Sequence, residues 1–436
     1  MKKSTKDIII IGFALFAMFF GAGNLIFPPY LGNIFGSNYI LSAIGFILTG
    51  VGLPLIGIIA CTKVNGDFEN IGRPVGPIFT KIFSISLFLT IGPMLAIPRT
   101  AATTYELAIS PVFPMIPCLA FVIFYFALNL VFVLNPSQIM DLIGKYLTPI
   151  LLITLSILIV KAILWPISPI INTGKAMPFA SGFKEGYQTM DALAALVFSS
   201  IVFKSILAKG YGENKVMSMT LKSGAIAIVG LALVYSGLMH LGAQTSSIFG
   251  ADVSKTYLLL EISKNNLGSI GSILIGITIG VACFTTSVGL ISSGSSFFES
   301  LTHGRLPYKF NAIVISIIGI VIGSSGVEQI VKLAGPILNI LYPMAITLIL
   351  LTLIKGVIKN NNIFKITVYT SLLFSILSTL SGIKYLNTYN IKTISLLTQL
   401  PLYESGFVWV IPTIIMFIIS FIFLNSSPTK SPLFAD

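Results

Sequence analysis

The sequence predicts an all-helical protein that crosses the membrane many times. Of its 436 residues, 55% are hydrophobic and only 9% are charged, and the mean hydropathy is +0.97. Soluble domains carry about 25% charged residues, so this chain is too apolar for a protein whose whole surface faces water. Long apolar runs recur along the whole sequence and are separated by shorter polar stretches.

Twelve apolar stretches are long enough to span a bilayer, whose hydrocarbon core of about 30 Å needs about 20 residues of helix. We expect spans near residues 8–31, 39–62, 77–98, 113–134, 146–165, 188–208, 221–243, 267–296, 310–326, 328–354, 363–383 and 406–424. The hydrophilic stretches 166–187, 244–266 and 384–405 are predicted to be loops. No convincing cleavage site follows the first apolar stretch, so it is interpreted as a retained helix of a single transmembrane domain, 1–436.

The basic residues predict the orientation. The net charge is +12, and the Lys and Arg residues fall between the apolar runs. With the N-terminus inside the cell, most of the 26 basic residues lie on the cytoplasmic side, which the positive-inside rule favours for both termini. Because these residues lie between apolar runs, where they orient the chain, nucleic acid is not an expected partner. The lipid bilayer is an expected partner, and no obligatory protein partner is evident.

The reactive side chains indicate neither an enzyme nor a transition-metal site. Cys61, Cys118 and Cys283 have no paired spacing, and His240 and His303 stand alone. No His–Glu pair and no serine with a plausible base falls in the middle of a span. We therefore expect no catalytic residue and no cofactor apart from a coupling ion.

The first span contains a helix-breaking centre in "AMFFGAGNLIFPPY", residues 17–30. Gly21, Ala22 and Gly23 interrupt an apolar helix, and an asparagine and two prolines follow. Backbone groups freed in hydrocarbon cost several kcal/mol unless they face protein or a wet cavity. A break there would offer amides to a carboxylate and carbonyls to an ammonium group or a small cation. The alternative is close helix packing by small residues.

Short motifs recur between the two halves of the chain. The Thr-Ile-Gly of residues 90–92 returns at 278–280, and the pattern that starts at Lys145 returns at Lys332 with a nearly equal offset. Chance similarity in apolar sequence is the alternative. Because five helices separate the partners, the second copy would run through the membrane in the opposite direction, as in inverted-repeat transporters.

This repeat defines the expected organisation. The first copy would cover 8–165, the second 188–354, and two additional helices would follow in 363–424. A matching break is then expected in the sixth span, and Phe198 to Ser200 is the stretch that offers it.

The eighth span, "VACFTTSVGLISSGSS", carries small and hydroxyl-bearing residues along one helix face. They are Ala282, Thr285, Thr286, Gly289, Ser293 and Ser296. One interpretation is tight packing, with hydroxyls bonded to the preceding turn. The other is a sodium site built from these hydroxyls and from carbonyls of the broken first span, because hard cations prefer oxygen ligands.

Proton coupling is the alternative to sodium, and it needs ionisable groups at membrane depth. The acidic candidates fall near predicted helix ends: Glu106, Asp141, Asp191, Glu299 and Glu328. Lys204 lies one turn past the expected break in the sixth span. It either snorkels to the interface, supplies an ammonium group at the site, or titrates. Arg99, at the predicted outer mouth of the third span, either guards the entrance or anchors the helix at the headgroups.

The chain resembles the branched-chain amino acid:cation symporters, the branched-chain amino acid transport system carrier proteins of bacteria. The matching motifs are "GAGNLIFPP", "VGLPL", "PRTA", "MDALAALVF", "ACFTTSVGL", "LYP", "GIK" and "LPLYESGFVWVIPT". The resemblance implies a five-plus-five inverted repeat of the amino acid–polyamine–cation transporter type, with helices 1 and 6 broken and two extra C-terminal helices. It also implies uptake of leucine, isoleucine and valine coupled to sodium or, in some members, to protons.

The resemblance also implies site residues. The amides of Gly21, Ala22 and Gly23 would hold the substrate carboxylate, and the carbonyls of Phe19 and Phe198 would take its ammonium group. The aliphatic pocket would consist of Phe19, Ile91, Met94, Phe198 and Ile201. The cation would meet the carbonyls of Ala17 and Phe20 and the hydroxyls of Thr285 and Thr286, on the helix face that includes Ala282.

The sequence thus predicts a multi-pass transporter of the bacterial plasma membrane that imports branched-chain amino acids by sodium-coupled alternating access. A channel would instead need repeated pore-lining polar rings. Two alternatives keep the same fold: the cargo is another small neutral amino acid or a nucleobase, or the coupling ion is a proton.

Overall fold

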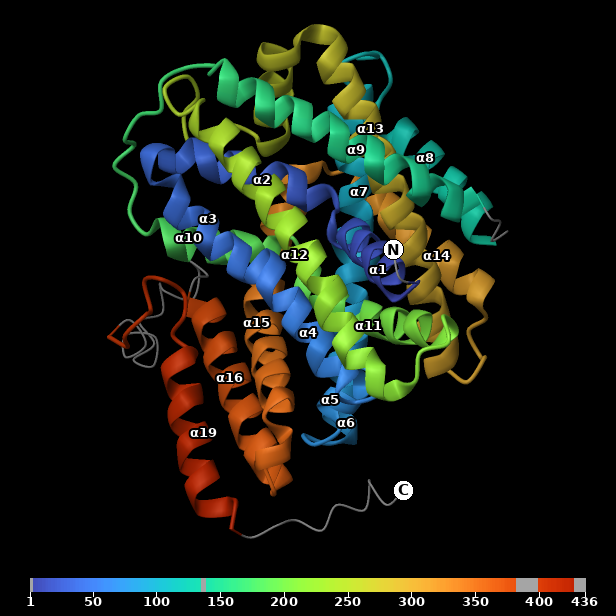
Figure 1. The fold of residues 1–436 in the computed structure, drawn as a ribbon, viewed down its shortest axis with the longest axis vertical. Helices are drawn as coiled ribbons and strands as arrows, with labels where there is room; N and C mark the ends of the chain where they lie inside the picture. Colours follow the sequence, from blue (N-terminus) through green and yellow to red (C-terminus); the bar gives the residue numbers. More distant parts are fainter. Residues whose placement is uncertain (1–2, 135–138, 382–398, 427–436) are drawn as a thin grey trace. The chain divides into compact units, whose positions relative to one another are not determined.

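The computed structural model describes residues 3–134, 139–381 and 399–426, and every regular element in these ranges is a helix (Figure 1). The elements of the first half are α1 (Lys3–Phe19), α2 (Ala22–Phe35), η1 (Gly36–Asn38), α3 (Tyr39–Ile47), η2 (Leu48–Gly52), α4 (Leu53–Thr62), α5 (Glu69–Gly72), α6 (Pro77–Leu89), η3 (Thr90–Met94), α7 (Ala96–Thr104), η4 (Tyr105–Ile109), α8 (Cys118–Leu134), α9 (Ile139–Leu164), α10 (Pro178–Gln188) and α11 (Asp191–Ala208). Those of the second half are α12 (Glu213–Ala243), α13 (Lys255–Leu301), α14 (Tyr308–Gly323), α15 (Val327–Leu353), η5 (Lys355–Val357), α16 (Asn361–Ser381) and α19 (Val410–Leu424).

Each of the twelve predicted ranges contains helix, so the all-helical class is confirmed. Seven helical stretches among the described residues are long and apolar enough to cross a membrane, and shorter apolar helices accompany them. The seven are Ala22–Thr62, Pro77–Ile109, Asp191–Ala208, Glu213–Ala243, Ile275–Leu301, Val327–Leu353 and Asn361–Ser381. The number of spans, twelve, stays a prediction.

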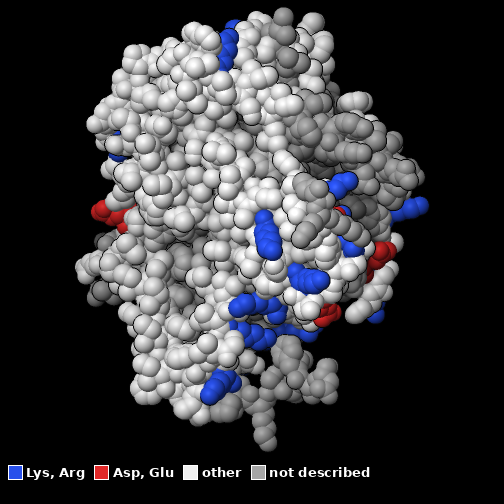
Figure 2. Space-filling model, in the orientation of Figure 1, with Lys and Arg blue, Asp and Glu red and all other residues white. Residues whose placement is uncertain are grey.

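The helices expose apolar side chains where a soluble protein would expose charges. On α14, Ile313, Ile317 and Val321 follow one another at steps of four and are 43%, 54% and 68% exposed, whereas Ile315 and Ser316 are buried. Steps of four keep residues on one helix face. Most of the surface in Figure 2 carries neither acidic nor basic residues. Such a surface suits contact with lipid tails.

The chain divides into two compact units, and each takes segments from both halves of the sequence. The first unit comprises Met1–Gly52, Phe88–Asp191 and Ser223–Gly335, and the second comprises Leu53–Leu87, Ala192–Lys222 and Pro336–Asp436. In the second unit, α16 and α19 pack side by side (Figure 1). The first unit holds both helix interruptions described below.

Glycine contacts bring helix backbones together in the first unit. A Cβ on Gly32 of α2 would overlap the carbonyl oxygen of Met239 on α12, and one on Gly242 would overlap that of Pro29. Gly45 of α3 and Gly182 of α10 meet each other's helices in the same way. Small residues allow this close approach, which fixes α2 against α12 and α10 against α3.

The predicted break in the first span is confirmed. Helix α1 ends at Phe19 and α2 begins at Ala22, so Phe20 and Gly21 are not helical. Gly21 has extended backbone, with φ −107° and ψ −174°. The chain therefore has two half-helices where an ordinary span would have one.

The predicted position of the break in the sixth span is wrong. Helix α11 continues through Phe198 to Ser200, and the interruption lies at Thr189–Met190, between α10 and α11. Met190 has a φ of 66°, in the left-handed region that β-carbon contacts disfavour. The serines do not break α11 because their hydroxyls bond back along it: Ser199 Oγ donates to Leu196 O at 2.6 Å.

Two predicted loops contain helix. The stretch 166–187 includes most of α10, and 244–266 includes the start of α13, which kinks at Gly268 with a φ of 72°. Hydropathy selects only helices that span the bilayer, and α10 is a short helix with a mixed composition. Most of the third predicted loop, 384–405, lies outside the described residues, and residues 399–405 form turns.

Candidate functional site

The break in the first span frees the carbonyls of Ala17 and Phe20. In a continuous helix they would accept bonds from the amides of Gly21 and Asn24, four residues later. Here the Gly21 amide donates to Phe19 O at 3.2 Å and to Asn24 Oδ1 at 3.3 Å, and the Asn24 amide donates to Gly21 O at 3.2 Å. The two carbonyls predicted to bind a cation thus lose their usual helix partners.

The same break exposes the start of α2. The first amides of a helix, here those of Ala22 and Gly23, have no acceptor within it, and the helix dipole makes this end attractive to anions. The space beside Gly21 is open: a Cβ there would meet only Asn24 Oδ1, at 3.7 Å. A carboxylate is the group that suits such amides.

Gly23 lies against a buried arginine. A Cβ on Gly23 would come within 2.8 Å of Arg99 Nη2 and 3.0 Å of Phe27 Cε2. The guanidinium carbon of Arg99 lies 5.6 Å from the centre of the Phe27 ring. Arg99 is only 3% exposed, so its positive charge lies inside the protein, next to the broken first helix.

Arg99 also binds the interruption of the sixth span. Its Nη1 donates to Gln188 O, and its Nη2 donates to Thr189 O at 3.3 Å. These carbonyls end α10, where the helix dipole favours a cation. Arg99 therefore connects the end of α10 to the start of α2, two segments far apart in the sequence.

A second connection joins the two interruptions through Asn24. Its Nδ2 donates to Asp191 Oδ2 and to the Tyr235 hydroxyl. Asn24, Asp191 and Tyr235 are 1%, 6% and 0% exposed. Asp191 is the first residue of α11, and its amide donates to Thr189 Oγ1 at 3.3 Å. The first turns of α2 and α11 are thus held together.

Aromatic rings fix Tyr235 in place. Its ring centre lies 6.1 Å from that of Phe20 in a stacked arrangement and 5.4 Å from that of Phe46 in an edge-on arrangement. Phe20 in turn stacks on Phe16 at 5.4 Å. The hydroxyl that meets Asn24 therefore belongs to a ring with little freedom.

The third span is interrupted as well. Residues Thr90–Met94 form a π-helical turn, and Gly92 has non-helical dihedrals of φ −91° and ψ −119°. Ile91 is 2% exposed, and Met94 is half-buried. A Cβ on the buried Gly92 would meet only Ile97 Cδ1, at 4.0 Å. The two predicted pocket residues of this span thus belong to a turn that has open space beside Gly92.

The predicted hydroxyl ligands lie on α13. Thr285 Oγ1 and Thr286 Oγ1 both donate to Ala282 O, at 2.9 and 3.0 Å, and the three residues are half-buried. Each hydroxyl keeps acceptor lone pairs after it donates. Nothing lies within 4 Å of a Cβ built on Gly289, one turn further along. No hydrogen bond among the described residues joins these threonines to Ala17 or Phe20.

The remaining predicted site residues belong to the second unit. Phe198 is 8% exposed, Ile201 is 47% exposed, and Lys204 is exposed, all on the unbroken helix α11. The role inferred for the Phe198 carbonyl rested on a break at that residue. Carbonyls in the middle of a helix are engaged by the amide four residues later.

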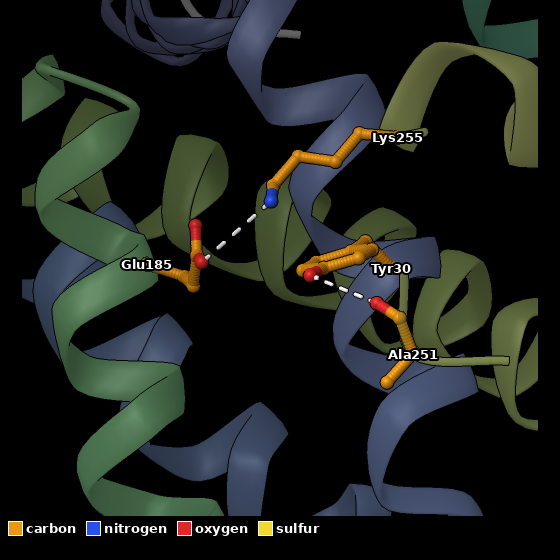
Figure 3. Close-up of polar contacts among 4 residues, drawn as sticks. All are labelled: Tyr30, Glu185, Ala251 and Lys255. Atoms are coloured by element: carbon orange, nitrogen blue, oxygen red, sulfur yellow. Dashed lines mark hydrogen bonds and ion pairs between the residues drawn. The ribbon is translucent and has the colours of Figure 1, made fainter. Parts of the chain in front are cut away.

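An ion pair connects α10 with the start of α13, next to a tyrosine of α2 (Figure 3). Lys255 Nζ, at the start of α13, lies 3.9 Å from Glu185 Oε1 on α10 and 3.5 Å from the centre of the Tyr30 ring on α2. The Tyr30 hydroxyl donates to Ala251 O at 3.3 Å. Lys255 and Glu185 side chains are 18% and 24% exposed, so both charges are largely removed from water.

Burial sets the titration of this pair. Burial raises the pKa of Glu185 above its ordinary value, and the positive charges of Lys255 and Arg99 offset part of that rise. Burial lowers the pKa of Lys255, and the negative charge of Glu185 opposes that effect. Desolvation disfavours the charged form of either group.

Sequence reasoning missed the polar connection between the interruptions. In the sequence, Asn24 is recognisable only as part of the break and Asp191 only as a residue near a helix end, and nothing in the residues around Tyr235 indicates a role. The available signal was the Asp in "MDALAALVF", because an acidic residue beside an apolar span is unfavourable without a partner. Among the described residues, no group of three or more His, Cys, Asp or Glu side chains is placed to hold a metal ion.

Solved structures share this fold. The nucleobase-cation-symport-1 transporter Mhp1, closed with bromovinylhydantoin bound, aligns with a TM-score of 0.63 at 12% identity, covering 98% of this chain and 94% of Mhp1. A mutant of the manganese transporter of Eremococcus coleocola aligns with a TM-score of 0.59 at 13% identity, covering 96% of both chains. These likenesses support the predicted fold.

Sequence relatives cover nearly the whole chain. The branched-chain amino acid permease BraB of Bacillus subtilis is 38% identical over 444 residues, or 99% of both chains. The permease BrnQ of the same organism is 40% identical over 426 residues, or 95% of this chain and 96% of BrnQ. The family model described as branched-chain amino acid transport protein matches residues 4–427. The chain therefore belongs to the branched-chain amino acid transport protein family, as its motifs predicted.

Proposed function

We propose that this protein is a secondary active transporter that imports leucine, isoleucine and valine by cation symport, with sodium as the coupling ion. The proposal takes its substrate class from the permeases that the chain resembles. It takes its mechanism from the broken helices, which offer free peptide groups inside the membrane region.

One observation supports an amino acid in particular. A buried arginine, Arg99, and a buried carboxyl group, Asp191, lie at the two interruptions, and both residues contact the first turn of α2 or its Asn24 side chain. A basic and an acidic side chain in one buried region can complement the two charged groups of a zwitterion. A nucleobase carries no such pair of charges, so the same features disfavour that alternative cargo.

The pocket residues implied by the family resemblance suit a branched aliphatic side chain. Among them, Phe19, Ile91 and Met94 belong to the first unit and would contact this side chain. We expect weak discrimination among leucine, isoleucine and valine, because one methylene in an apolar pocket changes binding by about 1–3 kcal/mol.

Sodium is the proposed coupling ion because the candidate ligands are all oxygens. The carbonyls of Ala17 and Phe20 lack their usual helix partners, and the hydroxyls of Thr285 and Thr286 retain acceptor capacity. Hard cations prefer such neutral and anionic oxygen donors. Proton coupling is the alternative, and buried Asp191 is the group that would bind the proton.

The expected location is the bacterial plasma membrane, with both termini in the cytoplasm. The distribution of Lys and Arg along the chain supports this orientation. Alternating access would then carry the amino acid inward past the interruptions of the first and sixth spans.

Transport into proteoliposomes tests the proposal. Purified protein would be reconstituted, and uptake of radiolabelled leucine would be compared under an inward sodium gradient, an inward proton gradient and no gradient. We expect saturable uptake that rises with the sodium gradient and is accelerated by unlabelled leucine, isoleucine or valine preloaded inside the vesicles. The same vesicles with a potassium gradient are the control.

Two outcomes would contradict the proposal. Uptake that increases linearly with leucine concentration, without acceleration by preloaded substrate, would indicate a channel. Uptake driven by the proton gradient alone would replace sodium by a proton while leaving the amino acid transporter intact.

A further inference from the structure

We propose that Asp191 recognises the α-ammonium group of the transported amino acid, so that it makes this group a requirement for binding. This inference rests on the proposed function and deepens it. The family resemblance assigns the ammonium group to the carbonyl of Phe198, in the middle of α11. The proposal assigns it instead to the carboxylate of Asp191, at the start of that helix.

The position of Asp191 is the first support. The sixth span is interrupted at Thr189–Met190, and Asp191 follows as the first residue of α11. Asn24 of α2 donates to its carboxylate and accepts from the amide of Gly21 at 3.3 Å. Two hydrogen bonds thus connect Asp191 to the glycine beside which the space is open.

The state of the carboxylate is the second support. An anion in the membrane interior is unfavourable unless nearby donors or positive charges compensate it. The positive ends of two helix dipoles lie at Asp191, because it is the first residue of α11 and accepts a hydrogen bond from the first turn of α2. These contacts offset part of the cost of burying a charged carboxylate, and the ammonium group of a bound ligand would supply the opposite charge that completes the compensation.

The charges around Asp191 leave room for a ligand cation. Arg99 on α7 is the nearby positive charge, and its Nη atoms bind the carbonyls of Gln188 and Thr189. Asn24 from α2 and Tyr235 from α12 are neutral. On α10, Glu185 is a second acid that shares the field of Arg99, and it is paired with Lys255 of α13. The polar partners of the Asp191 carboxylate itself are neutral donors, so a ligand ammonium group would be its matched cation.

The geometry of an α-amino acid fits this arrangement. Its carboxylate and ammonium group are bonded to the same carbon atom. A ligand whose carboxylate lies at the helix-start amides of Ala22 and Gly23 would direct its ammonium group towards the turn that holds Asn24. The Asp191 carboxylate accepts a hydrogen bond from that asparagine and would also accept from the ammonium group.

Binding of ligands that lack one charged group tests the inference. The probes are leucine, 4-methylpentanoate, which is leucine without its amino group, and 3-methylbutylamine, which lacks the carboxylate. Purified full-length protein would bind radiolabelled leucine in detergent, and the other two would compete. The wild type should prefer leucine over 4-methylpentanoate by about 10³-fold or more, because that acid leaves a buried carboxylate without its partner.

The Asp191→Asn variant should lose this preference. We expect its leucine affinity to fall about 100-fold, while 4-methylpentanoate binds as well as to the wild type or better. The ratio of the two affinities should therefore fall about 100-fold or more, which a purely structural role of Asp191 would not produce. Asp191→Glu keeps the charge and should keep the preference for ligands with an ammonium group.

The matched control is Asp252→Asn, which removes a carboxylate from an exposed loop position and should leave the ratio unchanged. Size-exclusion chromatography checks folding, and Asp191→Ala serves as a second neutral variant if the asparagine variant aggregates. Should both neutral variants misfold, persistence of the wild-type ratio in Asp191→Glu supports the inference, and a collapsed ratio in a folded Asp191→Glu overturns it.

The failures are distinguishable. If the wild type binds leucine and a folded neutral variant retains the wild-type affinity ratio, the inference is overturned and the proposed function stands. If such a variant keeps its leucine affinity but loses only a dependence on pH or sodium, Asp191 binds the coupling ion instead. If the wild type binds no branched-chain amino acid, both the function and the inference fail.

Discussion

The side chain of Asn24 donates a hydrogen bond to Asp191, a residue 167 positions later in the chain. This contact joins the interruption of the first helix to that of the sixth, and Arg99 makes a second connection between the same regions. Helix breaks are tolerated in a membrane only where their free peptide groups meet protein or a hydrated cavity. The Asn24–Asp191 hydrogen bond and the contacts of Arg99 therefore explain how two helix breaks can be accommodated in one apolar fold.

Gly21→Val should abolish leucine uptake while the protein still inserts and folds. The extended backbone of Gly21 suits a β-branched residue, and the space beside it is open. The new side chain would then occupy the space proposed for the substrate. Proteoliposome uptake and leucine binding measure the effect, and normal leucine affinity in this variant would refute the proposed carboxylate site at the amides of Gly21, Ala22 and Gly23. Gly32→Val is the contrasting variant, because its Cβ would overlap Met239 O, and we expect it to misfold.

Thr286→Val should raise the sodium concentration needed for half-maximal uptake by about tenfold, which corresponds to about 1.4 kcal/mol. The change removes a hydroxyl proposed to bind the ion at nearly constant side-chain size. Sodium titrations of leucine uptake provide the measurement. Ser295→Ala is the control, because Ser295 also bonds back to its own helix, at Ile291 O. An unchanged sodium dependence in Thr286→Val would remove this residue from the ion site.

Arg99→Lys should lower leucine uptake about tenfold or more, although the charge is kept. A lysine cannot reproduce the planar fork that reaches both Gln188 O and Thr189 O. Hydrogen bonds from charged groups contribute about 1.5–3 kcal/mol, so the thermal stability of the purified protein should fall as well. Arg305→Lys, at an exposed position, is the matched control. Uptake and stability equal to those of the wild type would show that the arginine fork has no role.

Glu185 should make the protein gain stability as the pH falls. Burial raises its pKa in the folded protein, so the folded state binds this proton more tightly than the unfolded state does. The stabilisation from protonated Glu185 is fully present at a pH below 4.5, the ordinary pKa of the group. It is lost as the pH rises through the raised pKa of the folded protein.

Glu185→Gln removes this titration. Thermal unfolding of both proteins between about pH 4.5 and pH 7.5 would show the wild type gaining stability relative to the variant on acidification. A difference between the two proteins that stays constant across this range, or that shrinks at low pH, would contradict the assigned direction.

The two interruptions illustrate what could be predicted from sequence. Gly21 lies in the first break and Gly23 follows in the first turn of α2, and this break could be predicted because glycine lowers helix stability. The break in the sixth span carries no such marker. Thr189 and Met190 resemble ordinary residues before a helix, and Ser199 can either interrupt a helix or bond back to it.

The candidate site divides in the same way. Carbonyls and amides near Gly21 could be predicted because their availability depends on local backbone geometry. The placement of Asp191, Arg99 and Tyr235 around them could not, because it depends on how the start of α11 and helices α7 and α12 pack beside α2. The partner of a buried charged residue can be identified only when the packing of the helices is known.

By itself the sequence determined the membrane class, the ranges of the apolar helices, the broken first span and the family. These properties follow from hydrophobic length and from residues that alter the backbone locally. Only the tertiary structure decided where the sixth span is interrupted and that Asn24, Asp191 and Arg99 connect the two interruptions. The physical reason is that buried polar groups must find partners, and those partners come from whichever helices pack beside them.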